Sequence, residues 1–291
     1  MRLPPEGCAV ARILISLLAT ITLTLAGCTP SHEPTVPFTG LTQDLRIRWS
    51  AEPGIDLLTG PAVIVRAYRE SYVLGGLMAN PAYYYPGFEH AVPPNGAKVS
   101  PLIRPLVTGD PQLESRGFQT TTPIVGTWRE HILSLTGDAT SGYTAKVCVW
   151  DYATGVRLEN GKYRYPNRLP PNPSSTSAPA DFATLPLRIT LTPPSPSEPD
   201  PTKTSQGGSS THPSTDVFGG WKIGAADSLS TAAWMGRITD WPLDDYRLTL
   251  YACAKKIPDS YEKLSSYMTG EHPRSDYPAL PADPGWPAAG T

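Results

Sequence analysis

The side chains that could do chemistry in this chain form none of the familiar catalytic or cofactor-binding motifs. The sequence contains no GxSxG, no HExxH, no P-loop and no GxGxxG that follows a strand. Of its five histidines, only His90 and His131 fall in segments of globular composition. A metal site built on histidines needs about three such ligands. The sequence therefore predicts no metal site and no cofactor.

A group of residues in the middle of the chain could still line a pocket with acid–base chemistry. Its members are Tyr83, Tyr84, Tyr85, His131, Trp150 and Asp151. In such a pocket Asp151 would be the base and a tyrosine the hydrogen-bond donor. The alternative is that the tyrosines pack at the domain surface and that Asp151 begins the turn Asp-Tyr-Ala-Thr-Gly, a normal position for Asp. We favour this alternative.

The start of the chain predicts export. Arg2 and Arg12 precede an uncharged, largely apolar run at 13–27. This run is too short to span a membrane, because a spanning helix needs about 20 apolar residues. It is typical of the apolar core of a secretory signal, which is removed from the mature protein.

The end of that run, Leu25-Ala26-Gly27-Cys28, resembles the lipobox of bacterial lipoprotein precursors, among them uncharacterised lipoproteins of mycobacteria and their relatives. In that family the small residues fit the signal peptidase, and the thiol receives a diacylglyceryl group. The resemblance implies that residues 1–27 are removed and that Cys28 anchors the protein on the extracytoplasmic face of the cell membrane. The alternative is an ordinary thiol after a standard secretory signal. Residues 28–40 are polar and Pro-rich, as in a tether.

The other cysteines agree with export. Cys8 would leave with the signal and Cys28 would carry lipid, so that Cys148 and Cys253 remain. A disulfide between these two is the natural pairing in an exported protein. The alternatives are two buried free thiols or a metal site, but neither cysteine has another Cys or a His within four residues.

Length and charge set limits on the class of protein. The chain has 291 residues, which is enough to bury a sizeable core. Its formal net charge is −2, and no basic patch or polybasic segment is present. Nothing therefore indicates nucleic acid as a partner or electrostatic binding to a membrane surface.

The clearest predicted element is an amphipathic helix at 61–78. Gly60-Pro61 is a helix-start signal, and Arg66, Arg69 and Glu70 share one polar face. Most of the remaining pattern predicts strands, at 127–135, 143–151, 185–192, 234–241 and 246–254, with a hairpin across Asn160-Gly161 and a short helix at 257–268.

Prolines divide the chain into ordered and loose parts. Residues 166–181 are predicted to be a linker, and residues 192–214 contain no aromatic or aliphatic side chain, so burial cannot offset the entropy cost of ordering them. We expect 192–214 to be a disordered insert within a single domain at 41–270. Residues 271–291 are predicted to be a loose Pro-rich tail.

This order of elements predicts an α+β fold, with one main helix packed on a curved antiparallel sheet and with long Pro-rich loops. It loosely resembles NTF2-like proteins, in which a curved sheet wraps a helix around a pocket. We interpret the protein as a lipid-anchored envelope protein with a non-enzymatic domain that binds a ligand or a neighbouring envelope protein. The alternative implied by the resemblance is a pocket enzyme for a small apolar ligand. A cavity in which Asp151 or His131 faces a tyrosine would favour the enzyme.

Overall fold

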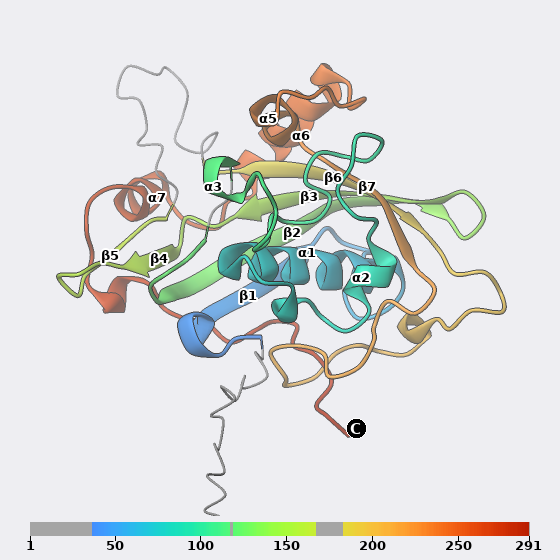
Figure 1. Ribbon diagram of the computed structural model, residues 1–291, viewed down its shortest axis with the longest axis horizontal. Helices are drawn as coiled ribbons and strands as arrows, with labels where there is room; N and C mark the ends of the chain where they lie inside the picture. Colours follow the sequence, from blue (N-terminus) through green and yellow to red (C-terminus); the bar gives the residue numbers. More distant parts are fainter. Residues whose placement is uncertain (1–36, 117–118, 167–182, 291) are drawn as a thin grey trace, which may run out of the picture. The chain divides into compact units, whose positions relative to one another are not determined.

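The computed structural model describes residues 37–116, 119–166 and 183–290. The predicted signal at 1–27, Cys28 and residues 167–181 of the predicted linker lie outside the described residues. Within the described part the chain has an α+β fold, in which helices pack on a curled, half-barrel sheet that is mostly antiparallel (Figure 1). The predicted fold class is therefore confirmed.

Seven strands of the described residues form one sheet. They are β1 (Asp44–Ala51), β2 (Ile124–Asp138), β3 (Gly142–Trp150), β4 (Thr154–Arg157), β5 (Tyr163–Arg164), β6 (Leu185–Thr192) and β7 (Lys222–Asp227). The order is β5-β4-β2-β3-β6-β7, with every pair antiparallel, and β1 pairs with β2 in the parallel direction. The predicted hairpin across Asn160-Gly161 is present as β4 and β5, and the predicted strand at 185–192 is β6.

The predicted helix at 61–78 is present with the same bounds as α1 (Pro61–Met78). Gly60 precedes it with a φ of 62° and Ala79 ends it in the left-handed region. The polar face predicted for Arg66, Arg69 and Glu70 does not lie in solvent, because all three residues are buried. The sheet covers one side of α1, and the loops after α1 and the end of the chain cover the others. Arg69 is paired with Glu130, Arg66 donates to backbone carbonyls, and Glu70 accepts from neutral side chains inside the protein.

The remaining helices are short. They are α2 (Phe88–Ala91), α3 (Leu113–Arg116), α5 (Leu229–Trp234), α6 (Leu243–Lys255) and α7 (Tyr261–Met268), with single 3-10 turns at Gly40–Thr42, Pro81–Tyr83, Pro201–Lys203 and Arg274–Asp276. The predicted helix at 257–268 is thus confirmed as α7, whose N-cap Ser260 accepts a hydrogen bond from the backbone N–H of Lys263. None of the helices within the described ranges has the length and hydropathy that a membrane span requires.

The predicted strands at 234–241 and 246–254 are wrong. The first stretch is the end of α5 and a loop, and the second lies in α6. Asp244 and Asp245 occupy the first turn of α6, where acidic side chains stabilise the positive end of the helix dipole. Thr249 and Cys253 are its buried residues, and their spacing of four places both on the face towards the sheet.

The sheet has a core on each side. α1 lies on one face, whereas α6 and α7 belong to a second core cluster that contains Cys148, Trp150 and Cys253. Cys148 of β3 and Cys253 of α6 form a disulfide with a Cα–Cα distance of 5.3 Å. The predicted pairing is confirmed, and it links α6 covalently to the sheet.

Two segments predicted to be loose are ordered. Within 192–214, Thr202 is buried and its carbonyl accepts a 3.0 Å hydrogen bond from the N–H of Gly60, which precedes α1. Within the predicted tail at 271–291, Trp286 is 1% exposed, and the carbonyl of Asp283 accepts a 2.7 Å hydrogen bond from the N–H of Trp49 on β1. Partners distant in sequence hold both segments, and local composition does not reveal such partners.

Candidate binding pocket

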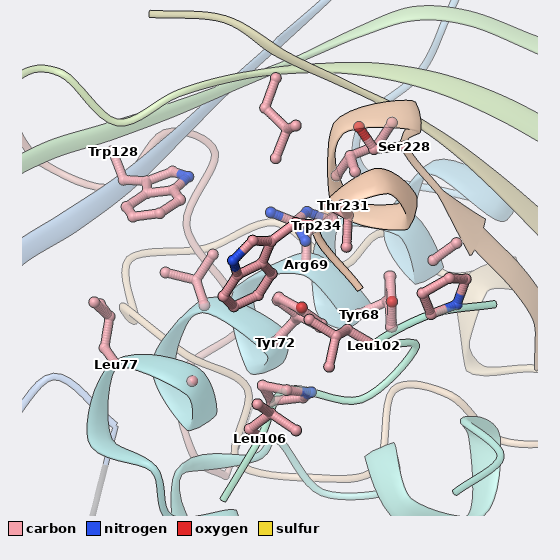
Figure 2. A pocket seen from close by; sticks show the side chains of 17 residues that line it. Tyr68, Arg69, Tyr72, Leu77, Leu102, Leu106, Trp128, Ser228, Thr231 and Trp234 are labelled. Carbon is pink, nitrogen blue, oxygen red and sulfur yellow. The ribbon is translucent and has the colours of Figure 1, made fainter. Parts of the chain in front are cut away.

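An apolar pocket lies on the α1 side of the sheet. Its cavity volume is about 260 Å³, and it is enclosed by α1, by strands β2, β6 and β7, by the loop at 101–106 and by α5 (Figure 2). The lining residues are Tyr68, Arg69, Tyr72, Val73, Gly76, Leu77, Pro101, Leu102, Pro105, Leu106, Trp128, Leu185, Leu187, Ala226, Ser228, Thr231 and Trp234. Pockets for drug-sized ligands have volumes of roughly 300–1,000 Å³, so this pocket suits a smaller molecule.

Because side chains alternate along a strand, every second residue of a strand faces the side of the sheet on which the pocket lies. Trp128 of β2 and Leu187 of β6 line it, and Ala226 of β7 lies opposite Ile189 in the register of β6 and β7. The next residue, Asp227, pairs with Arg188 on the other face of the sheet. Ala226 is small, so this part of the wall leaves space that a larger side chain would fill.

The loop that closes one side is held in an uncommon conformation. Leu102 has a φ of 55°, in the left-handed region that residues other than Gly rarely adopt. The hydroxyl of Tyr68 on α1 donates a 2.8 Å hydrogen bond to the carbonyl of Ile103, and the side chain of Ser100 accepts a 3.1 Å bond from the N–H of Ala226. The loop is therefore fixed to both the helix and the sheet. Backbone strain of this kind persists where the surrounding structure enforces it, often at binding sites.

One buried ion pair borders the pocket. Arg69 donates from Nε to both carboxylate oxygens of Glu130, at 3.3 and 3.1 Å, and from Nη2 to Oε1 at 3.1 Å. Their side chains are 5% and 0% exposed. Burial raises the pKa of Glu130, and Arg69 opposes that rise. Because arginine remains protonated in proteins and its fork fits the carboxylate, the pair is ionised and carries no net charge.

Polar atoms at the pocket are few. The ring of Tyr72 lies 5.0 Å from the guanidinium carbon of Arg69, and within the described chain the Tyr72 hydroxyl has no hydrogen-bond partner. Burial raises the pKa of Tyr72, although Arg69 opposes it, so the phenol is neutral and available as a donor. Ser228 is already bonded to Ser230 at 2.9 Å. Trp234 of α5 is 52% exposed, so it lies at the mouth of the pocket (Figure 2).

The structure does not bring the predicted acid–base group together, and none of its members lines this pocket. Tyr85 donates a 2.6 Å hydrogen bond to Glu70 on α1, the ring of Tyr84 lies 4.2 Å from that of Phe88, and Tyr83 is buried in the same core cluster. The tyrosines therefore pack in the core, neither in a shared pocket nor at the domain surface.

The other members lie across the sheet. The carboxylate of Asp151 accepts a 2.6 Å hydrogen bond from the hydroxyl of Tyr165, and its carbonyl accepts a 3.0 Å bond from the N–H of Thr154, so it begins a turn. Burial raises the pKa of Asp151. The rings of Trp150 and His131 stack at 6.0 Å.

His131 belongs to a separate polar chain. Its Nδ1 lies 2.9 Å from the Ser50 hydroxyl, its Nε2 lies 3.2 Å from the Glu52 carboxylate, and Glu52 accepts from Lys256 at 2.5 Å. This order of serine, histidine and acid is the one used in nucleophilic catalysis. Ser50, however, is exposed on β1, and the cavity does not reach it. The chain instead joins β1, β2 and the end of α6.

Among the described residues, no three His, Cys, Asp or Glu side chains lie close enough together to hold a metal ion. Comparison with protein-family models, with curated proteins and with solved structures found no match. The pocket must therefore be interpreted from its own residues.

Sequence reasoning missed Arg69, Tyr72, Trp128 and Glu130 as residues at or beside the pocket. One signal was present, because Trp128, Glu130 and Ile132 alternate on one face of a predicted strand. An acid on an apolar strand face calls for a buried cation as its partner. The pattern did not identify which helix residue would pair with Glu130.

Proposed function

We propose that this protein is a lipid-anchored envelope protein whose α+β domain binds a small apolar ligand without transforming it. The observation that carries the proposal is the cavity of about 260 Å³ between α1, the sheet and α5, which is lined mainly by aliphatic and aromatic side chains. Apolar pockets with a few polar groups are the usual form of small-molecule sites.

The lining supports binding more than catalysis. Its one charged residue, Arg69, already pairs with Glu130, and the Tyr68 hydroxyl already donates a hydrogen bond to the carbonyl of Ile103. A general base must reach the proton that it removes, and neither Asp151 nor His131 is near this cavity. The pocket enzyme therefore has less support than the binding protein.

Anchoring through Cys28 is the second part of the proposal. It is supported by Leu25-Ala26-Gly27-Cys28 at the end of the apolar run. The Cys148–Cys253 disulfide agrees with it, because disulfides persist mainly in oxidising compartments outside the cytoplasm. The test is Cys28→Ala in the full chain, with Cys8→Ala as the matched control. We expect release from the membrane fraction for Cys28→Ala alone, and retention of both variants would contradict the anchor.

Ligand binding is tested by filling the pocket. Ala226→Leu places a larger side chain in the wall, and Ala225→Leu makes the same change on the opposite face of β7, where Ala225 pairs with Thr190. With n-decanol as the probe in isothermal titration, we expect binding to the wild type and to Ala225→Leu. Ala226→Leu should bind more weakly by about tenfold, or 1.4 kcal/mol. Equal binding by the two variants would place the ligand elsewhere.

A further inference from the structure

We infer that the pocket selects an uncharged ligand: an apolar chain that ends in one hydrogen-bonding group, such as an alcohol, and not a fatty-acid carboxylate or an alkylamine. This inference rests on the proposed function and adds the chemical class of the ligand. It follows from the charge balance and the free donors at one corner of the pocket, which we call the Arg69 corner and define as Arg69, Tyr72 and Glu130.

The charge of the Arg69 corner is already balanced. Glu130 takes three hydrogen bonds from Arg69 at 3.1–3.3 Å, and both side chains are almost wholly shielded from solvent. Trp128 donates a further bond to Glu130 at 3.2 Å. A ligand carboxylate would bring a second negative charge to one guanidinium, and a ligand amine would bring a second positive charge. An uncompensated charge in an apolar site is costly, whereas an uncharged ligand adds none.

The Arg69 corner still offers hydrogen bonds. Nη1 of Arg69 donates to no other residue of the described chain, since its bonds to Glu130 come from Nε and Nη2. The Tyr72 hydroxyl is likewise unengaged within the described part of the chain, and its ring lies 5.0 Å from the Arg69 guanidinium carbon. Arg69 and Tyr72 both line the cavity, so neighbouring side chains of its wall carry the two donors. A hydroxyl or carbonyl oxygen would satisfy them, which an alkane cannot do.

The rest of the cavity offers apolar contact. Val73 and Leu77 of α1, Leu187 of β6, and Leu102 and Leu106 of the loop provide aliphatic surface for a hydrocarbon chain. Burial of such a chain contributes about 0.8 kcal/mol for each CH₂ group removed from water. The aliphatic wall thus supplies affinity, and the Arg69 corner, whose charges are balanced, gives no net attraction to a charged head group.

The experiment compares head groups on one chain length. Isothermal titration at neutral pH uses n-decanol, decanoate and decylamine below their aggregation concentrations, against wild type, Ala226→Leu and Ala225→Leu. We expect n-decanol to bind tighter than either charged probe by about tenfold or more. Decanoate or decylamine binding as tightly as n-decanol would overturn the inference and leave the proposed function standing. If no probe binds in a way that Ala226→Leu weakens, the proposed function itself fails.

Glu130→Gln tests the cause of the selectivity. It keeps the shape of residue 130 but leaves Arg69 without a counter-charge. The affinity for decanoate relative to that for n-decanol should therefore rise by about tenfold. An unchanged ratio in a folded variant, checked by circular dichroism, would overturn the charge-balance argument. If Glu130→Gln does not fold, the double variant Arg69→Met with Glu130→Met replaces it. That variant removes both charges and should keep the preference for n-decanol, and a preference for decanoate there would overturn the inference.

Discussion

The two faces of the sheet are packed in different ways. On the face of α6 and α7, the disulfide joins helix to strand, and the described cavity does not extend to that face. On the face of α1, a helix that is buried nearly all round pairs its Arg69 with Glu130 and leaves a cavity beside that pair. Both faces contain ion pairs, but the face of α6 and α7 has a covalent link in addition, whereas the face of α1 has the buried Arg69–Glu130 pair and the hydrogen bonds of Glu70. The cavity lies on the face of the sheet opposite the disulfide.

Removing Glu70 should have the largest effect on the α1 face. Its carboxylate accepts hydrogen bonds from Trp49 at 2.8 Å, from Tyr85 at 2.6 Å and from Trp286 at 2.8 Å. Burial raises the pKa of Glu70, and nearby Arg66 opposes that rise. Glu70→Ala would leave three donors without their acceptor and would remove a negative charge near the buried Arg66. We expect a loss of about 3–5 kcal/mol in the free energy of unfolding, measured by urea denaturation.

The matched control for this loss is an acid at the surface. The side chain of Glu89 is 69% exposed, and its nearest cation, Arg104, lies 3.8 Å away. Glu89→Ala should change stability by less than about 0.5 kcal/mol. Similar effects of the two substitutions would show that the buried network on α1 is not what stabilises this face.

Breaking the disulfide should weaken the other face and spare the pocket. Cys148 and Cys253 are separated by 105 positions in the sequence, so their bond closes a long loop. Replacing both with Ser should lower the free energy of unfolding by about 2–5 kcal/mol. Binding of n-decanol to the folded variant should be unchanged, because neither cysteine lines the cavity. A large loss of binding in titrations at low temperature would contradict the independence of the two faces.

Lowering the pH should reduce the stability of the folded state through His131, which lies on the α6 side of the sheet. Burial lowers the pKa of His131, against the opposing effect of Glu52. The folded state therefore binds this proton less readily than the unfolded chain, whose histidine has a pKa of about 6.5. The contribution of His131 to stability is present above that value and is lost as the pH falls below it.

The measurement is the free energy of unfolding at a series of pH values. His131→Gln should flatten the fall below about pH 6.5, and His212→Gln serves as a second probe, because burial also lowers the pKa of His212. If the free energy of unfolding of His131→Gln falls with pH as steeply as that of the wild type, protonation of His131 is not coupled to unfolding.

Loss of the N-cap of α7 should have the smallest effect. Ser260 accepts a hydrogen bond from the N–H of Lys263 at the start of that helix. Ser260→Ala should cost about 1 kcal/mol in the free energy of unfolding. Ser266→Ala, within the same helix, is the control, and a cost for it equal to that of Ser260→Ala would show that the cap makes no specific contribution.

The elements with strong local signals were predictable from the sequence. Gly60-Pro61 marked the start of α1, and the alternation of Leu185, Leu187 and Ile189 marked β6. The Cys148–Cys253 pairing followed from counting cysteines in a chain predicted to be exported. In each of these cases the signal lay within a few residues or depended on composition alone.

The errors have a common physical cause, which is long-range contact. The stretch 246–254 alternates like a strand, yet Thr249 and Cys253 show a helical spacing that matters only once the sheet is there to bury them. Trp286 is ordered because it reaches Glu70, which lies far away in the sequence. The pocket combines α1, three strands, a loop and α5. No single segment of the sequence contains enough of that lining to predict it.

The most direct test of the central claim is titration of n-decanol into Ala226→Leu and Ala225→Leu. The two substitutions are adjacent on β7 and identical in chemistry, and they differ in the face of the sheet that they reach. We predict that Ala225→Leu binds as the wild type does and that Ala226→Leu loses about tenfold in affinity. Equal affinity in both variants would contradict a ligand site between α1 and the sheet.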